Sequence, residues 1–306
     1  MDQLNSKKTL LADISLFIVA IVWGSGFIAT KNALGDIPPL FLTGTRFALG
    51  GLILTCIFYK RLKTLSKSDI LGAVSVGVIL FLAFTTQTYG LQTTEAGKSA
   101  FLTGTNVVMV PFLFWMIHKK APDKFAFVAA FICLGGIALL SLEKTSFTLQ
   151  VGDSLTLICA FFYACHIAST GYYAKRMDPL ALSIVQFAVV ASLSLVAGFF
   201  LEPIPVGLPL TSWFPVFYLA IFGTCIAFAL QTIGQKYTHS THAAIILSME
   251  SVFGALLGVL LLNEVLTFKM FIGCMTILLA ILTAETKWSF FRKHPKMTTH
   301  LVTESE

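Results

Sequence analysis

Apolar runs alternate with short polar segments along almost the whole chain. Each run is about 20 residues long, the length of a helix that crosses a hydrocarbon layer about 30 Å thick. Strands with open edges cannot face lipid, because their backbone groups would lack hydrogen-bond partners. The pattern therefore predicts an all-α membrane protein with ten transmembrane helices, at residues 10–32, 38–58, 69–91, 97–117, 124–142, 153–174, 179–201, 213–235, 241–262 and 268–288.

The composition excludes a water-soluble domain. Hydrophobic residues make up 56% of the chain and charged residues 12%, whereas about 25% of the residues in a soluble domain are charged. All six cysteines lie in apolar runs, without a C-x-x-C pair. They therefore predict neither a disulfide nor a metal site, and we expect no cofactor.

Positive charges are divided unevenly between alternate loops. Sixteen of the 21 Lys and Arg residues lie in segments that share a side with the N-terminus. The four in the opposite segments are Lys31, Lys98, Lys144 and Lys269. Cytoplasmic loops keep the positive excess, so residues 1–9 and the basic tail 289–306 are both predicted in the cytoplasm of a cell-membrane protein. Contact with membrane lipid then explains the net charge of +6, and no nucleic-acid partner is expected.

The two halves of the chain resemble each other in sequence. A shift of 144 residues places residues 87–90 (QTYG) on 231–234 (QTIG). A shift of 140 residues places residues 39–42 (PLFL) on 179–182 (PLAL). Repeats of this kind indicate that one unit was duplicated.

Each of the two predicted repeats, residues 10–142 and 153–288, contains five predicted spans. Because five is odd, the second repeat enters the membrane in the opposite direction, which gives two inverted-topology five-helix repeats. This symmetry is typical of transporters that open one midplane site to either side of the membrane. The alternative to a transporter is that the unit was duplicated for stability alone.

Two ionisable residues lie near the middle of predicted spans. Glu250 is central in the ninth span and Arg46 in the second. Charges at this depth are costly, so they are candidates for function. Glu250 is a candidate proton carrier, and an ion pair between Glu250 and Arg46 is a further hypothesis. The alternative for Arg46 is a packing role.

The repeat brings other polar residues into the same hypothesis. Under the shift of 144, Glu250 falls on Asn106, and Gln87 falls on Gln231. Four polar groups around one pseudo-twofold axis could bind a zwitterion, with Glu250 holding an ammonium group and the amides donating or accepting hydrogen bonds. Hydrogen bonding between buried amides of neighbouring helices is the alternative for each glutamine.

Aromatic residues complete the predicted site. Under the shift of 140, Trp23 in the first span falls on Tyr163 in the sixth, and the pair could wall an apolar side chain or stack on a cation. His166 is a candidate ligand for substrate or a satisfied core histidine. Gly24 and Gly26 follow Trp23 and predict a bend in the first span.

These residues also carry a resemblance to a known family. The chain resembles the ten-span EamA-type carriers of the drug/metabolite transporter superfamily over nearly its whole length. The resemblance rests on the order and spacing of Trp23-Gly24-Ser25, Pro39, Arg46, Glu250-Ser251-Val252-Phe253, Asn263-Glu264 and Gly273. Ser251 stands where the family often has Pro, and Lys120 where its first repeat often ends in Glu. The resemblance implies movement of amino acids, their derivatives or other small metabolites, often outward and without ATP.

We therefore expect a secondary transporter for a small polar or amphipathic metabolite, with amino acids and their derivatives as the first class. Proton coupling and a homodimer are left open. The alternative is a facilitator or channel without coupling, whose flux would not depend on protonation of Glu250.

An enzyme is not expected. Gly97-Lys98-Ser99 lacks the first glycine of a phosphate-binding loop, because Gln92 stands in its place. An enzyme acting on lipid would need a polar cluster at one interface, and His239 with His242 has no acidic neighbour closer than Glu250.

Overall fold

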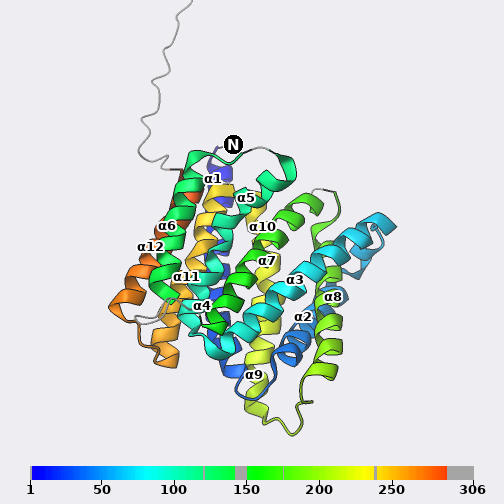
Figure 1. The fold of residues 1–306 in the computed structure, drawn as a ribbon. Coiled ribbons are helices and arrows are strands. Elements are labelled where there is room, and N and C mark those ends of the chain that lie inside the picture. Colours follow the sequence, from blue (N-terminus) through cyan, green and yellow to red (C-terminus); the bar gives the residue numbers. More distant parts are fainter. Residues whose placement is uncertain (1, 120, 142–149, 175, 238–239, 288–306) are drawn as a thin grey trace, which may run out of the picture.

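The computed structural model describes residues 2–119, 121–141, 150–174, 176–237 and 240–287, and these residues form a bundle of helices (Figure 1). The described part of the chain contains no strand. In chain order the elements are α1 (Asp2–Ala33), α2 (Pro39–Leu62), α3 (Lys67–Thr93), α4 (Ala96–Gly104), α5 (Asn106–His118), α6 (Lys124–Ser141), α7 (Val151–Tyr173), α8 (Pro179–Leu201), α9 (Leu210–Tyr218), the π-helix η1 (Leu219–Ile226), α10 (Ala227–Tyr237), α11 (Ser240–Leu262) and α12 (Phe268–Thr286).

The all-helical membrane fold is confirmed. Eight segments of the described residues are long and apolar enough to cross a membrane, and two shorter apolar helices accompany them. The ten segments coincide with the ten predicted spans. The fourth span consists of α4 and α5, which meet at Thr105, and the eighth consists of α9, η1 and α10. The predicted tail, residues 289–306, lies outside the described residues.

Two details of the first span differ from the prediction. Helix α1 begins at Asp2, within the polar segment 1–9, because a helix satisfies its own backbone and can continue beyond the hydrocarbon layer. The predicted bend at Gly24 and Gly26 is absent, since α1 is one continuous helix. Gly24 instead allows a close approach of α11, because a Cβ atom there would lie 2.7 Å from Cβ of Phe253.

Several helix starts follow from local sequence. Pro39 and Pro179 occupy first helical positions, where a missing N–H costs nothing. The Asp178 side chain accepts from the amides of Leu180 and Ala181 and caps α8. Ser66 and Asp69 form a capping box at the start of α3.

Helices of the two halves pack in matching pairs. Helix α2 packs against α8, α4 against α11, and α6 against α12 (Figure 1). Each pair joins helices at the same place in the two halves. Because the members of a pair are five places apart in the order of the spans, they run in opposite directions, as inverted repeats require.

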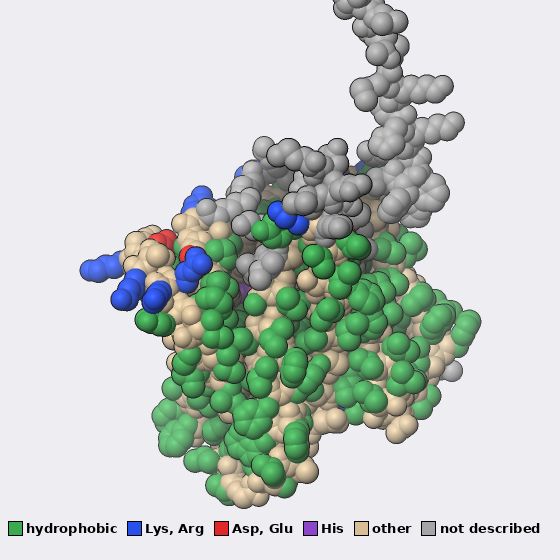
Figure 2. All heavy atoms as spheres, turned by 180° about the vertical axis from the view of Figure 1, so that it is seen from behind, with side chains coloured by type: hydrophobic (Ala, Val, Ile, Leu, Met, Phe, Trp, Pro, Cys, Tyr) green, Lys and Arg blue, Asp and Glu red, His purple; other side chains and the backbone are tan. Residues whose placement is uncertain are grey.

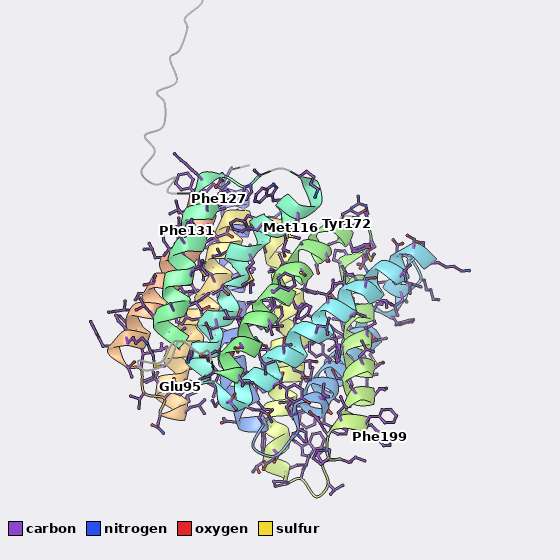
Figure 3. All side chains as sticks on the ribbon, viewed as in Figure 1. Glu95, Met116, Phe127, Phe131, Tyr172 and Phe199 are labelled. Atoms are coloured by element: carbon purple, nitrogen blue, oxygen red, sulfur yellow. The ribbon has the colours of Figure 1, made fainter. Side chains whose placement is uncertain are left out.

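The outside of the bundle is apolar. Figure 2 shows hydrophobic side chains over the flank, with Lys and Arg gathered at one end of the described molecule. Large exposed side chains such as Phe131 and Phe199, 75% and 61% exposed, point away from the bundle (Figure 3). This flank can face lipid, where apolar side chains cost nothing.

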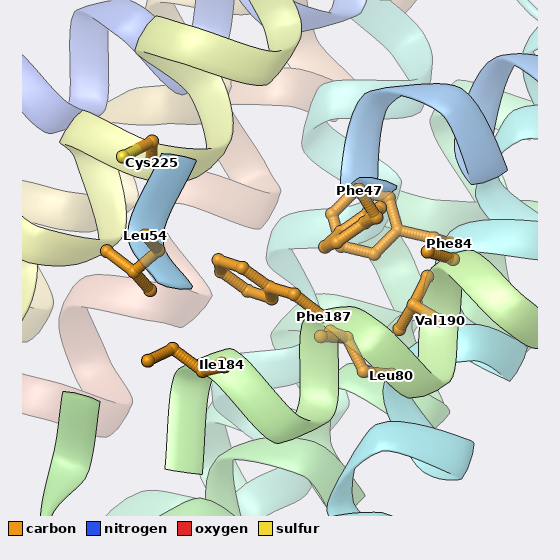
Figure 4. Close-up of a cluster of buried hydrophobic side chains, with 9 residues drawn as sticks. Phe47, Leu54, Leu80, Phe84, Ile184, Phe187, Val190 and Cys225 are labelled. Carbon is orange, nitrogen blue, oxygen red and sulfur yellow. The ribbon is translucent and has the colours of Figure 1, made fainter. Parts of the chain in front are cut away.

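The largest apolar cluster joins α2, α3 and α8. Phe47 lies at its centre with edge-to-face contacts to Phe84 and Phe187, at ring-centroid distances of 4.7 and 5.3 Å (Figure 4). Leu54 and Leu80 fill the space beside these rings. The cluster holds the second span against the second half, next to Arg46.

Candidate substrate-binding cavity

A cavity of about 910 Å³ lies between the two halves of the bundle. Helices of both halves contribute to its wall, from α1 to α12. All eight residues singled out in the sequence line it: Trp23, Arg46, Gln87, Asn106, Tyr163, His166, Gln231 and Glu250. The structure thus brings the residues together, while their roles toward a substrate stay predictions.

Gln87 connects three helices at the cavity wall. The hydroxyl of Tyr163 donates to Gln87 Oε1 at 3.2 Å, and Gln87 Nε2 donates to the hydroxyl of Thr103 at 3.3 Å. The interhelical hydrogen bonding considered for this residue is therefore present, at a position that also faces the cavity.

The aromatic residues form two walls of the cavity. Trp23 makes an edge-to-face contact with Phe228 at 5.4 Å, and Tyr163 makes one with Phe84 at 5.5 Å. Trp23 and Tyr163 therefore each pair with a phenylalanine. The indole N–H of Trp23 donates to the carbonyl of Gly223 at 3.0 Å, which ties α1 to the π-helix.

Arg46 is 8% exposed and is held from two sides. Its Nε donates to the hydroxyl of Thr224 at 2.9 Å. Its Cζ atom lies 4.8 Å from the ring centre of Phe84 and 5.5 Å from that of Phe47, within cation–π range.

The hypothesised ion pair between Arg46 and Glu250 is not formed. In the described part of the chain, the pairs within 4.0 Å are Arg61–Asp178, Lys98–Asp153 and Lys287–Asp123. Arg46 and Glu250 face the same cavity and interact electrostatically over a longer distance. Phe84, Phe47 and Thr224 fix the guanidinium, which leaves room between it and the carboxylate.

His166 is both a wall residue and a hydrogen-bonded one. Its Nε2 lies 2.8 Å from Gln186 Oε1 and 3.3 Å from the hydroxyl of Thr170. The Gln186 oxygen can only accept, so Nε2 carries the proton in this arrangement. The histidine joins α7 to α8 and presents its remaining ring surface to the cavity.

Several residues of this wall were not predicted from the sequence, among them Gln186, Ser248 and Glu285. Glu285 is a second carboxylate on the cavity, carried by the last turn of α12. Its place inside the predicted span 268–288 was a sufficient reason to consider it. Gln186 also had a signal in the sequence, because the shift of 140 residues places Arg46 on it.

The cavity reaches one end of the bundle. Its wall includes Gly171 and Ala174 at the end of α7 and Pro179 at the start of α8. Tyr172 marks this end in Figure 3. The side chains of His239 and His242 are outside those that the structure describes, and no group of three or more metal-ligating side chains occurs among the described residues.

Polar contacts between the halves close the opposite end, which Glu95 marks in Figure 3. Lys98 of α4 pairs with Asp153 of α7 at 2.6 Å, and Thr94 donates to the same carboxylate at 3.1 Å. Lys31 donates to the carbonyl of Thr94. Burial and the nearby Glu264 raise the pKa of Glu95, whereas Lys98 and Lys31 oppose that rise.

Two further carboxylates join the halves at this closed end. Glu264, after α11, accepts from the backbone N–H groups of Ala96 and Gly97 at the start of α4. Glu202, after α8, accepts from the N–H groups of Leu40 and Phe41 at the start of α2 and from the Tyr89 hydroxyl. Negative charge at a helix N-terminus is favourable.

A helical membrane bundle with a cavity between two halves has the architecture of the transporter class. Residues 10–142 and 150–285 each match the EamA-like transporter family, and the chain belongs to that family.

Other relatives support the same class. The chain is 34% identical over 280 residues to an "Uncharacterized transporter" of Archaeoglobus fulgidus, covering 92% of this chain and 87% of that protein. It is 23% identical over 277 residues to an "S-adenosylmethionine/S-adenosylhomocysteine transporter" of Chlamydia trachomatis, covering 83% of each. A crystal structure at 18% identity has the same fold, with a TM-score of 0.67, and covers 94% of this chain and 99% of that one.

Proposed function

We propose that the protein is a secondary transporter that binds a small polar or amphipathic metabolite in the cavity between the halves and moves it by alternating access. The observation that carries the proposal is the cavity itself, which reaches one end of the bundle at Gly171 and Pro179, while the buried pair of Lys98 and Asp153 joins the halves at the opposite end. Rocking of one predicted repeat (10–142) against the other (153–288) would exchange the open and closed ends.

Amino acids and their derivatives are the proposed substrates. The cavity offers a carboxylate at Glu250 for an ammonium group, amides at Gln87 and Gln231, and aromatic walls at Trp23 and Tyr163. The name of the chlamydial relative supports this class, since S-adenosylmethionine is itself an amino-acid derivative.

Both termini are proposed to lie in the cytoplasm of a cell-membrane protein. The concentration of Lys and Arg at one end of the bundle supports this orientation. The open end of the cavity then faces the cytoplasm, and the end closed by Lys98 and Asp153 faces outward.

Glu250 is proposed to couple transport to protons. A carboxyl group at this depth can take up a proton when the substrate's ammonium group leaves, which avoids an uncompensated buried charge. The alternative, a facilitator without coupling, is less well supported, because buried polar contacts between described residues join the halves at the closed end.

Transport into proteoliposomes tests both parts of the proposal. Uptake of labelled amino acids is measured for the native chain, Glu250→Gln and the control Glu285→Gln, which changes the other carboxylate of the cavity wall, each with and without a proton gradient. We expect the gradient to accelerate uptake by the native chain and the control, and to leave Glu250→Gln unaffected. Equal uptake by all three, indifferent to the gradient, would favour the facilitator.

A further inference from the structure

Arg46 has more hydrogen-bond donors than the described residues satisfy. A guanidinium carries five N–H groups, and the one hydrogen bond of Arg46 to another described side chain uses Nε. No carboxylate of the described residues lies within 4.0 Å of it. Burying a cation without a counter-ion is costly, and the Arg46 side chain, 8% exposed, has no carboxylate partner among the described residues.

The guanidinium is held in a fixed position beside open space. The rings of Phe84 and Phe47 and the hydroxyl of Thr224 fix its plane. Arg46 and Gly223 both line the cavity, and a Cβ atom at Gly223 would lie 3.3 Å from Arg46 Nη2. The glycine therefore keeps the space next to Nη2 free.

A rare local structure supports this arrangement. Gly223 and Thr224 belong to the π-helix η1, and π-helical turns occur frequently at functional sites. The Thr224 hydroxyl donates to the carbonyl of Leu219, five residues earlier, so its oxygen is free to accept from Arg46. The Gly223 carbonyl accepts from Trp23 on its other side. The π-helix thus aligns two wall residues of the cavity.

We propose that Arg46 binds the carboxylate of the substrate, with its two Nη nitrogens donating in parallel to the two oxygens. This inference rests on the proposed function and names the chemical group that the site selects. Parallel N–H donors match the geometry of a carboxylate, and a charged pair of hydrogen bonds is strong in a site shielded from water. Because Glu250 is more than 4.0 Å away, a substrate with both a carboxylate and an ammonium group can bridge the two side chains.

Thermal unfolding of the purified full chain tests the proposal without relying on transport. The probes are L-phenylalanine and L-methionine, each compared with its carboxamide, which keeps the ammonium group and loses the negative charge. We expect the native chain to bind each amino acid more tightly than its amide by about ten-fold or more, as the loss of charged hydrogen bonds predicts. Arg46→Gln should bind the two forms equally.

Further variants keep the test valid if Arg46→Gln folds poorly. Thr224→Val removes the acceptor that fixes Nε and should reduce the preference for carboxylates, and Arg46→Lys should do so as well, because a lysine has no parallel donors. Glu250→Gln should weaken the amino acid and the amide alike and leave their ratio unchanged.

The outcomes separate the inference from the proposed function. A native chain that binds amino acids and amides equally overturns the assignment of Arg46, whatever its transport activity. A preference for carboxylates that is lost in Arg46→Gln supports the assignment, even if no uptake is measured and the proposed function fails. Loss of the preference in Glu250→Gln as complete as in Arg46→Gln would also overturn it.

Discussion

The two ends of the bundle are held together in different ways. At the closed end Asp153 is fully buried and Lys98 is 11% exposed, whereas at the open end the pair Lys287–Asp123 is 56% and 38% exposed. Removing one partner of a buried pair costs about 3–5 kcal/mol, and an exposed pair contributes about 0–1 kcal/mol. The buried pair at the closed end is therefore expected to contribute more to the stability of this conformation than the exposed pair at the open end.

The largest expected effect comes from breaking the buried pair. Lys98→Met leaves the Asp153 carboxylate buried without a cation and should lower the free energy of unfolding by about 3–5 kcal/mol. Thermal unfolding followed by tryptophan fluorescence measures the change. Lys287→Met at the open end is the matched control and should cost about 1 kcal/mol or less.

A double variant sharpens this comparison. Lys98→Met with Asp153→Leu removes both charges and should regain most of the lost stability, because an apolar pair carries no unpaired charge. A double variant that unfolds as easily as Lys98→Met alone would show that the charge is not the cause.

Two glycines on α7 give a second contrast between the ends. A Cβ atom at Gly152, near the closed end, would lie 2.7 Å from the carbonyl oxygen of Gly90, whereas at Gly171, near the open end, it would meet nothing within 4 Å. Gly152→Ala should destabilise by about 1–3 kcal/mol through overpacking. Gly171→Ala should be neutral or stabilise by up to about 1 kcal/mol through helix propensity. Chemical denaturation compares the two, and equal effects would contradict the difference in packing.

The smallest expected effects are pH dependences of opposite sign. At the open end, hydrogen bonding to Lys287 lowers the pKa of Asp123, so its stabilising contribution is present at neutral pH and is lost as the pH falls through that lowered pKa. At the closed end, burial raises the pKa of Glu95, so its contribution is lost as the pH rises from the ordinary glutamate range through the raised pKa.

Stability measured against pH in Asp123→Asn and Glu95→Gln checks these signs. In Asp123→Asn, the free energy of unfolding should fall less than in the native chain as the pH is lowered. In Glu95→Gln, it should fall less than in the native chain as the pH is raised above the ordinary glutamate range. Both effects are small because neither group is fully buried. If both substitutions changed the pH dependence of stability in the same direction, the opposite pKa shifts assigned to Asp123 and Glu95 would be contradicted.

The sequence was sufficient for the fold and for eight residues of the cavity wall. Span length and apolarity define the helices, and the shifts of 144 and 140 residues relate Glu250 to Asn106 and Trp23 to Tyr163, all of which line the cavity. The position of Glu250 and Arg46 near the middle of a span indicated that they line the cavity, because an ionisable residue exposed to lipid is costly.

The contacts within the wall could not be predicted in the same way. The Gly24 bend and the pairing of Arg46 with Glu250 were both wrong, because each depends on which helix packs alongside. Gly24 meets Phe253 of α11, and Arg46 meets Thr224 in a π-helix that no periodic pattern indicates. Gln186, in contrast, was within reach of the sequence, because the shift of 140 residues places Arg46 on it.

Alternating access is the central claim, and cross-linking the closed end tests it most directly. Cysteines at positions 98 and 153, introduced as Lys98→Cys and Asp153→Cys with the exposed Cys56 replaced by Ser, are joined with a reducible bifunctional thiol reagent in proteoliposomes. Single-cysteine variants treated in the same way are the controls. The account predicts that uptake falls to background after cross-linking and returns after reduction. Full uptake while the two positions remain joined would contradict it.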